Sequence, residues 1–135
     1  MYEKILVPLD GSSVDQFIIR HLLQLAPIHH SRVFLLRVLH FHTRDSLAHE
    51  TAEAAEYLRT VCTSFDQAKI PAESIIEYGE PDEVILSVSV NRGCDLIAMA
   101  SHGHRLIKDM LMGSVVNKVR HATAIPILVV RAESA

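Results

Sequence analysis

The sequence predicts an α/β fold, namely a single doubly wound parallel sheet of five strands with helices on both faces. The chain contains five short apolar runs, amphipathic segments between successive runs, and only 5 Gly and 5 Pro in 135 residues. Apolar runs without polar alternation are typical of strands buried on both faces, and their alternation with helices is typical of parallel βαβ units. The length fits one globular domain, which we expect to span residues 1–135.

Each expected strand is an apolar run bounded by turn residues. The five runs are residues 5–9, 32–39, 72–78, 95–100 and 125–130. Between them, apolar residues recur at helical spacing. The expected helices begin after Ser13, extend over about 46–68, run from Pro81 to Asn91, and cover 112–124. Ser13 and Gln16 fit a capping box at the start of the first helix, and Pro81 suits the first turn of the third.

Charge and composition exclude several classes of protein. With a net charge of -3, 21% charged residues and scattered basic residues, the chain lacks an extended surface suited to nucleic acid. No apolar run approaches the roughly 18 residues that cross a bilayer, and the apolar stretch at the N-terminus is too short for a signal peptide. Cys62 and Cys94 lie far apart, which favours buried free thiols in a reducing compartment. We therefore expect a cytoplasmic protein that binds neither nucleic acid nor membrane.

The segment from Ala100 to Ser114 follows the fourth expected strand and reads A-S-H-G-H-R-L-I-K-D-M-L-M-G-S. Its glycines, Gly103 and Gly113, allow a ligand to approach the backbone closely. Ser114 stands where the next helix is expected to begin, so unpaired backbone N–H groups and the positive end of the helix dipole lie beside it. These donors, together with the cationic side chains of the loop, suit a phosphate group. The alternative is a glycine-rich turn that only joins strand to helix.

Asp10 lies in the turn after the first expected strand, Pro8-Leu9-Asp10-Gly11-Ser12. In an open parallel sheet, ligands bind beyond the carboxyl ends of the strands, where the winding order reverses. If the first and fourth strands are neighbours there, Asp10 and the Ala100–Ser114 loop face each other across one crevice. A carboxylate opposite a phosphate-binding loop suits ribose hydroxyl groups, so the pair predicts a nucleotide site. The alternative for Asp10 is turn chemistry alone, because Asp-Gly-Ser is a common turn sequence.

A spaced glycine motif follows the fourth expected strand. It consists of Ala100-Ser101-His102-Gly103, nine further residues, and Gly113-Ser114. The opening K-I-L-V-P-L-D-G-S, the Gly79-Glu80-Pro81 turn and the closing P-I-L-V-V accompany it. In these features the sequence resembles the ATP-binding branch of the universal stress protein family, whose motif is G-x-x-G, nine residues, then G-S or G-T. Alanine replaces the first motif glycine here, and His104 stands where the family often has arginine, with Arg105 next.

The resemblance implies an adenine nucleotide alpha hydrolase-like fold with strand order 3-2-1-4-5, and a bound adenine nucleotide. ATP is the expected ligand, with AMP or cyclic AMP as alternatives and Mg²⁺ as a possible companion of the phosphates. The expected role is a nucleotide-dependent regulator or a stress-tolerance factor. The expected nucleotide-binding residues are Pro8, Leu9, Asp10, Val38, Ala100, Ser101, His102, Gly103, His104, Arg105, Gly113, Ser114 and Val115.

Other functions stay open from the residues alone. Histidines follow the second and fourth expected strands in two pairs, His40 with His42 and His102 with His104. Alternating residues of an extended backbone point to opposite sides, so each pair supplies one ligand to a single metal unless the loop turns, and we expect no metal site. No catalytic triad or Walker-type lysine motif is legible, so the enzyme alternative is a slow ATP hydrolase. A nucleotide-free dimeric scaffold is the remaining alternative.

The last expected strand, Ile127-Leu128-Val129-Val130, should lie at an edge of the sheet because it follows the fourth helix. An uncharged apolar edge strand pairs readily with another chain unless it is covered. The resemblance implies antiparallel pairing with the same strand of a second subunit, which gives a two-fold homodimer. The alternative is an edge shielded by residues 131–135.

Overall fold

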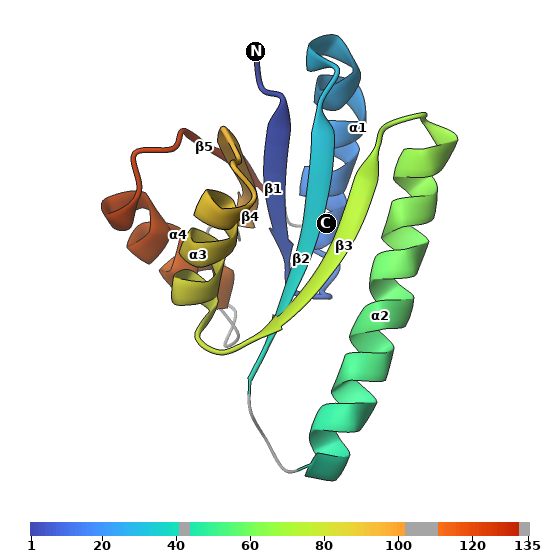
Figure 1. The fold of residues 1–135 in the computed structure, drawn as a ribbon, viewed down its shortest axis with the longest axis vertical. Coiled ribbons are helices and arrows are strands. Elements are labelled where there is room, and N and C mark those ends of the chain that lie inside the picture. The colour runs from blue at the N-terminus through green and yellow to red at the C-terminus, as the bar shows by residue number, and fades with distance from the viewer. Residues whose placement is uncertain (41–43, 102–110, 133–135) are drawn as a thin grey trace.

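The computed structural model describes residues 1–40, 44–101 and 111–132. Within these ranges strands and helices alternate along the chain (Figure 1). They are β1 (Lys4–Leu9), α1 (Asp15–His29), β2 (Arg32–Leu39), α2 (Arg44–Gln67), β3 (Ala72–Tyr78), α3 (Pro81–Asn91), β4 (Leu96–Ser101), α4 (Leu111–Ala122) and β5 (Ile127–Arg131). β2 and β3 have the expected bounds. None of the helices described here is long and apolar enough to cross a membrane.

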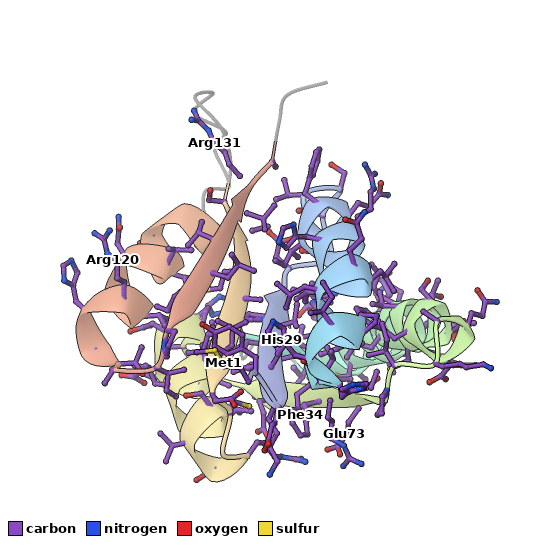
Figure 2. All side chains as sticks on the ribbon, turned by 90° about the horizontal axis from the view of Figure 1, so that it is seen from above. Met1, His29, Phe34, Glu73, Arg120 and Arg131 are labelled. Carbon is purple, nitrogen blue, oxygen red and sulfur yellow. The ribbon has the colours of Figure 1, made fainter. Side chains whose placement is uncertain are left out.

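The strands form one parallel sheet in the order β3-β2-β1-β4-β5. This arrangement confirms the predicted doubly wound α/β fold and its strand order. From β1 the chain winds outward through β2 to β3, then returns to the centre and continues through β4 to β5. Crossovers in opposite directions place α1 and α2 on one face of the sheet and α3 and α4 on the other, as seen along the strands in Figure 2.

Both faces of the sheet carry a core, which explains why the strands lack polar alternation. In β2, Val33 and Leu35 pack with the apolar residues of α1 and α2. Phe34 and Leu36 pack with those of α3 and α4. All four side chains are buried, because successive residues of a strand point to opposite faces and both faces are covered by helices.

β1 and β4 are neighbours where the winding direction reverses, but they pair over a short length. β1 pairs with β2 along its whole length, whereas only Ile5 and Leu6 pair with β4. Pro8 lies beyond the last β1 residue that pairs with β4. Proline is tolerated there, since it lacks the N–H group that only a paired strand would need. The pairing of β1 and β4 therefore ends before their carboxyl ends, at the edge of the sheet where a ligand is expected.

The start of α1 differs from the expected capping box. Val14 occupies the cap position in a helical conformation, with φ −63° and ψ −30°, and no side chain caps the helix. The Gln16 N–H donates to the carbonyl oxygen of Ser13, not to its hydroxyl. The capping-box prediction was wrong because the turn is held by a different residue. The carboxylate of Asp15, the first residue of the helix, accepts hydrogen bonds from the main-chain N–H groups of Asp10 and Gly11.

Both cysteines are free thiols, as expected. Cys94 is buried, whereas Cys62 is half-buried, with its Sγ 3.0 Å from the hydroxyl oxygen of Ser74. Burial, assisted by the nearby Asp95 carboxylate, raises the pKa of Cys94 to about 11. The Cys94 thiol is therefore protonated at neutral pH and is a poor nucleophile.

Candidate functional site

A cavity of about 550 Å³ lies at the carboxyl ends of β1 and β2. Its walls come from the β1–α1 turn, the end of β2, the first half of α2 and the starts of α3 and α4. A volume of this size is typical of sites for small molecules and cofactors. The cavity thus occupies the edge of the sheet at which doubly wound folds bind ligands.

Five of the expected nucleotide-binding residues line this cavity. They are Pro8, Leu9 and Asp10 from the end of β1 and its turn, Val38 from β2, and Val115 from α4. The cavity therefore brings together three segments that are far apart in the sequence.

The other expected residues divide into two groups. Ala100 and Ser101 end β4, and Gly113 and Ser114 belong to the first turn of α4. Ala100 is buried in the core beneath α1 and α2, so the methyl group that replaces the motif glycine packs within the protein. The rest of the motif lies outside the described residues: His102, Gly103, His104 and Arg105.

Asp10 both forms a turn and lines the cavity, the two alternatives that the sequence left open. Its Oδ1 accepts a hydrogen bond from the Ser12 N–H at 2.8 Å, which is the pattern of an Asx turn. The residue is nevertheless half-buried and lines the cavity. Because a carboxylate has several lone pairs, the turn hydrogen bond leaves Asp10 able to accept another from a ligand hydroxyl group.

Asp15, the first residue of α1, holds the main chain of two cavity-lining residues, Asp10 and Gly11, and the sequence motifs do not identify it. It is 2% exposed, and its carboxylate accepts hydrogen bonds from Asp10 N–H at 3.1 Å, Gly11 N–H at 2.8 Å and the Tyr57 hydroxyl at 2.6 Å. Burial raises the pKa of Asp15 from 3.8 to about 6, although the Tyr57 hydrogen bond opposes the shift. The available signal was a lone carboxylate at an inward helical position, three residues before Ile18.

Tyr57 of α2 and Arg37 of β2 also line the cavity without belonging to a sequence motif. The guanidinium carbon of Arg37 lies 5.6 Å from the centroid of the Tyr57 ring, a cation–π contact. Burial and then the hydrogen bond to Asp15 raise the pKa of Tyr57, so its hydroxyl stays protonated and donates to the carboxylate. The signal for Arg37 was a single cation inside the otherwise apolar run V-F-L-L-R-V-L.

Gly11 joins these groups, and its replacement gives a first prediction. Its φ is +84°, and a Cβ added to it would lie 2.7 Å from Nη1 of Arg37. We expect Gly11→Ala to lower the free energy of unfolding by roughly 1–2 kcal/mol from the left-handed backbone alone. The Arg37 guanidinium must also shift, at a small additional cost because it is the far end of a flexible side chain. Urea unfolding monitored by circular dichroism measures the change.

Gly93→Ala is the matched control for this prediction. Gly93 also has a positive φ, +66°, but an added Cβ would meet only Nζ of Lys4, at an ordinary contact distance of 3.8 Å. The control therefore carries the backbone cost without the collision. If Gly11→Ala destabilises the protein less than Gly93→Ala does, the packing of Arg37 against Gly11 is wrong.

The histidines expected at this edge are only partly within the described chain. His40 lines the cavity, whereas His42, His102 and His104 fall outside the described residues. Among the side chains that the structure places, no group of three or more His, Cys, Asp or Glu is arranged to hold a metal ion.

An open parallel α/β sheet with a cavity at its carboxyl edge, next to the winding reversal, defines a doubly wound fold with a candidate ligand site. Residues 1–131 match the model of the Universal stress protein family. The chain belongs to the universal stress protein family.

Relatives support the family assignment over nearly the whole chain. Universal stress protein MJ0577 of Methanocaldococcus jannaschii is 26% identical over 97% of this chain and 96% of its own length. The solved structure of MJ0577 has a TM-score of 0.84 at 28% identity and covers 100% of this chain and 99% of that chain.

Two further solved structures share the fold and hold nucleotides. A universal stress protein in complex with cAMP has a TM-score of 0.79 at 19% identity, with 98% of this chain and 99% of that chain covered. The universal stress protein from Archaeoglobus fulgidus in complex with dAMP has a TM-score of 0.74 at 19% identity, with 95% and 97% covered. At such identities the likeness concerns the fold alone.

Proposed function

We propose that this protein binds an adenine nucleotide, ATP in the first place, in the cavity at the carboxyl edge of the sheet. The observation that carries the proposal is that Asp10, Val38 and Val115, from three separate elements, line one cavity of about 550 Å³. Complexes of other universal stress proteins with cAMP and dAMP support adenine as the base. The protein would act in the cytoplasm as a nucleotide-dependent regulator or stress-tolerance factor.

The nucleoside would lie against the ends of β1 and β2. Pro8 and Leu9 supply apolar wall, and the backbone of Val38 offers polar groups to an adenine edge. The Asp10 carboxylate can accept hydrogen bonds from the hydroxyl groups of a ribose. This half of the cavity therefore has the mixture of apolar surface and few polar groups that suits a nucleoside.

The phosphates would lie toward the start of α4. The first N–H groups of a helix have no partner within the helix and carry partial positive charge, and the first turn of α4 includes Gly113 and Ser114. On the α2 side, Glu50 and Glu53 line the cavity and would repel anionic phosphates. Mg²⁺ would enter with the phosphates of ATP, whose oxygen atoms are ligands that it prefers.

Isothermal titration calorimetry with ATP, AMP and cyclic AMP tests the proposal. We expect saturable binding at one site per chain, with ATP bound most tightly, and unchanged nucleotide when the mixture is later analysed by chromatography. Stoichiometric or faster conversion of ATP to ADP would support the slow-hydrolase alternative. An absence of binding by all three nucleotides at millimolar concentration would contradict the proposal.

We further propose that two chains pair through β5. Among the described residues β5 pairs only with β4, so its outer side offers backbone N–H and C=O groups to the strand of another chain. Val129 in the middle of β5 is 43% exposed. Figure 2 shows β5 running along the margin of the sheet, with Arg131 near its end.

Val129→Lys is expected to convert a dimer into a monomer, because a charge in the middle of an edge strand opposes strand pairing. Light scattering after size exclusion should give about twice 15.1 kDa for the wild type and 15.1 kDa for the variant. Val90→Lys is the control, since Val90 is another exposed valine, on α3. A wild-type protein that is monomeric at all accessible concentrations would overturn the dimer.

A further inference from the structure

The β1–α1 turn is held by an unusual arrangement around the Asp15 carboxylate. Two donors are successive main-chain N–H groups, of Asp10 and Gly11, and the third is the hydroxyl of Tyr57, 42 residues along the chain. Two successive N–H groups that point to the two oxygens of one carboxylate form a concave site for an anion. Asp15 supplies that anion from within the protein.

We infer that Asp15 and Tyr57 are positioning residues for the nucleotide site, which hold the β1–α1 turn in the conformation that directs the Asp10 carboxylate into the cavity. This inference rests on the proposed function. The main chain of Asp10 is fixed by Asp15, and its side chain is fixed by the Ser12 N–H. Both constraints act on the same residue, so the carboxylate has little freedom before a ligand arrives.

The packing around Tyr57 indicates why the arrangement is rigid. Arg37 lies over the Tyr57 ring and against Gly11, so a β2 side chain holds the ring on one side. Tyr57 itself belongs to α2, the helix whose Glu50 and Glu53 also form part of the cavity wall. The hydrogen bond from Tyr57 to Asp15 thus ties the turn to that wall.

Tyr57→Phe is the direct test, because it removes one donor to Asp15 and keeps the ring. We expect it to weaken ATP binding by roughly three- to tenfold in titration calorimetry. Tyr78→Phe is the matched control: the Tyr78 hydroxyl contacts the Thr51 hydroxyl of α2 at 2.9 Å, and Tyr78 is not one of the described residues that line the cavity. The control should leave ATP affinity within twofold of the wild type.

A second measurement needs no nucleotide and separates positioning from general packing. The amide proton of Gly11 should titrate with the Asp15 carboxyl in NMR spectra of the free protein. Among the described residues, the titratable groups that act on Asp15 are Tyr57 and Asp10, and both Arg37 and Asp10 act on Tyr57. Because the Tyr57 hydrogen bond lowers the pKa of Asp15, Tyr57→Phe should move the midpoint of the Gly11 titration to higher pH. Tyr78→Phe should not move it.

The two measurements distinguish failure of the inference from failure of the proposed function. If the wild type binds no ATP, the proposed nucleotide function is wrong, and the Gly11 titration alone decides whether Asp15 and Tyr57 hold the turn. If the wild type binds ATP but Tyr57→Phe changes neither the affinity nor the Gly11 midpoint, the positioning role is overturned.

Discussion

Replacement of Asp10 by alanine is expected to weaken ATP binding by about 10- to 100-fold, the value of hydrogen bonds to a charged group. Asp10 lines the cavity, and its carboxylate is the group of the β1–α1 turn that can accept a hydrogen bond from a ribose hydroxyl. The turn itself should survive, because the hydrogen bond from the Asp10 main chain to Asp15 does not involve the removed side chain. Titration calorimetry measures the affinity, and thermal unfolding checks that the fold is intact.

Asp66→Ala is the control for the effect of charge alone. Asp66 is an exposed acid on α2, outside the cavity lining, so its removal changes the net charge by the same amount. ATP affinity of this variant should stay within twofold of the wild type. Equal affinities of Asp10→Ala and the wild type, with both proteins folded, would place the nucleotide away from Asp10.

Asp15→Asn is expected to alter the pH dependence of the free energy of unfolding. The wild type loses a contribution of roughly 2–3 kcal/mol as the pH rises, and the variant should lack this contribution. The pKa of Asp15 is about 6 in the folded protein, above its ordinary value of 3.8, so between pH 4 and 6 the folded state binds more protons than the unfolded state. The free energy of unfolding of the wild type therefore falls as pH rises through this window, through the contribution of Asp15. Asparagine does not titrate, so the variant lacks this contribution.

The measurement is urea unfolding of both proteins at several pH values from 4 to 8. Other carboxyl groups titrate in both proteins, so their contributions largely cancel when the two free energies are subtracted. The variant should gain stability relative to the wild type as pH rises from 4 to 6, and the difference should be constant above pH 7. A difference that is flat from pH 4 upward would mean that the Asp15 carboxyl ionises at an ordinary pKa.

The fold could be predicted from sequence because its signals are local and repeated. β2 shows this clearly: Val33, Phe34, Leu35 and Leu36 form an unbroken apolar run, and the two faces of the sheet separate them into two cores. Helix ends were predicted less well. The Ser13–Gln16 box failed because a pattern of residue types does not reveal that Asp15 accepts the hydrogen bonds of the preceding turn.

The candidate site was predictable where residues belong to a motif, and not where they meet through the fold. Asp10 and Val38 are identified by their places at strand ends, and both line the cavity. Asp15, Arg37 and Tyr57 come from three elements, and only the sheet order and helix packing bring them together. Each is a single polar residue at an inward-facing position, which can be recognised in the sequence. The sequence does not show, however, which residue it contacts.

A crystal structure of the protein soaked in millimolar ATP tests the nucleotide site most directly. We predict density for an adenine nucleotide in the cavity at the ends of β1 and β2, with a ribose hydroxyl within hydrogen-bond distance of Asp10 and the phosphates directed toward the first turn of α4. An empty cavity under these conditions, or a nucleotide bound elsewhere on the surface, would contradict it.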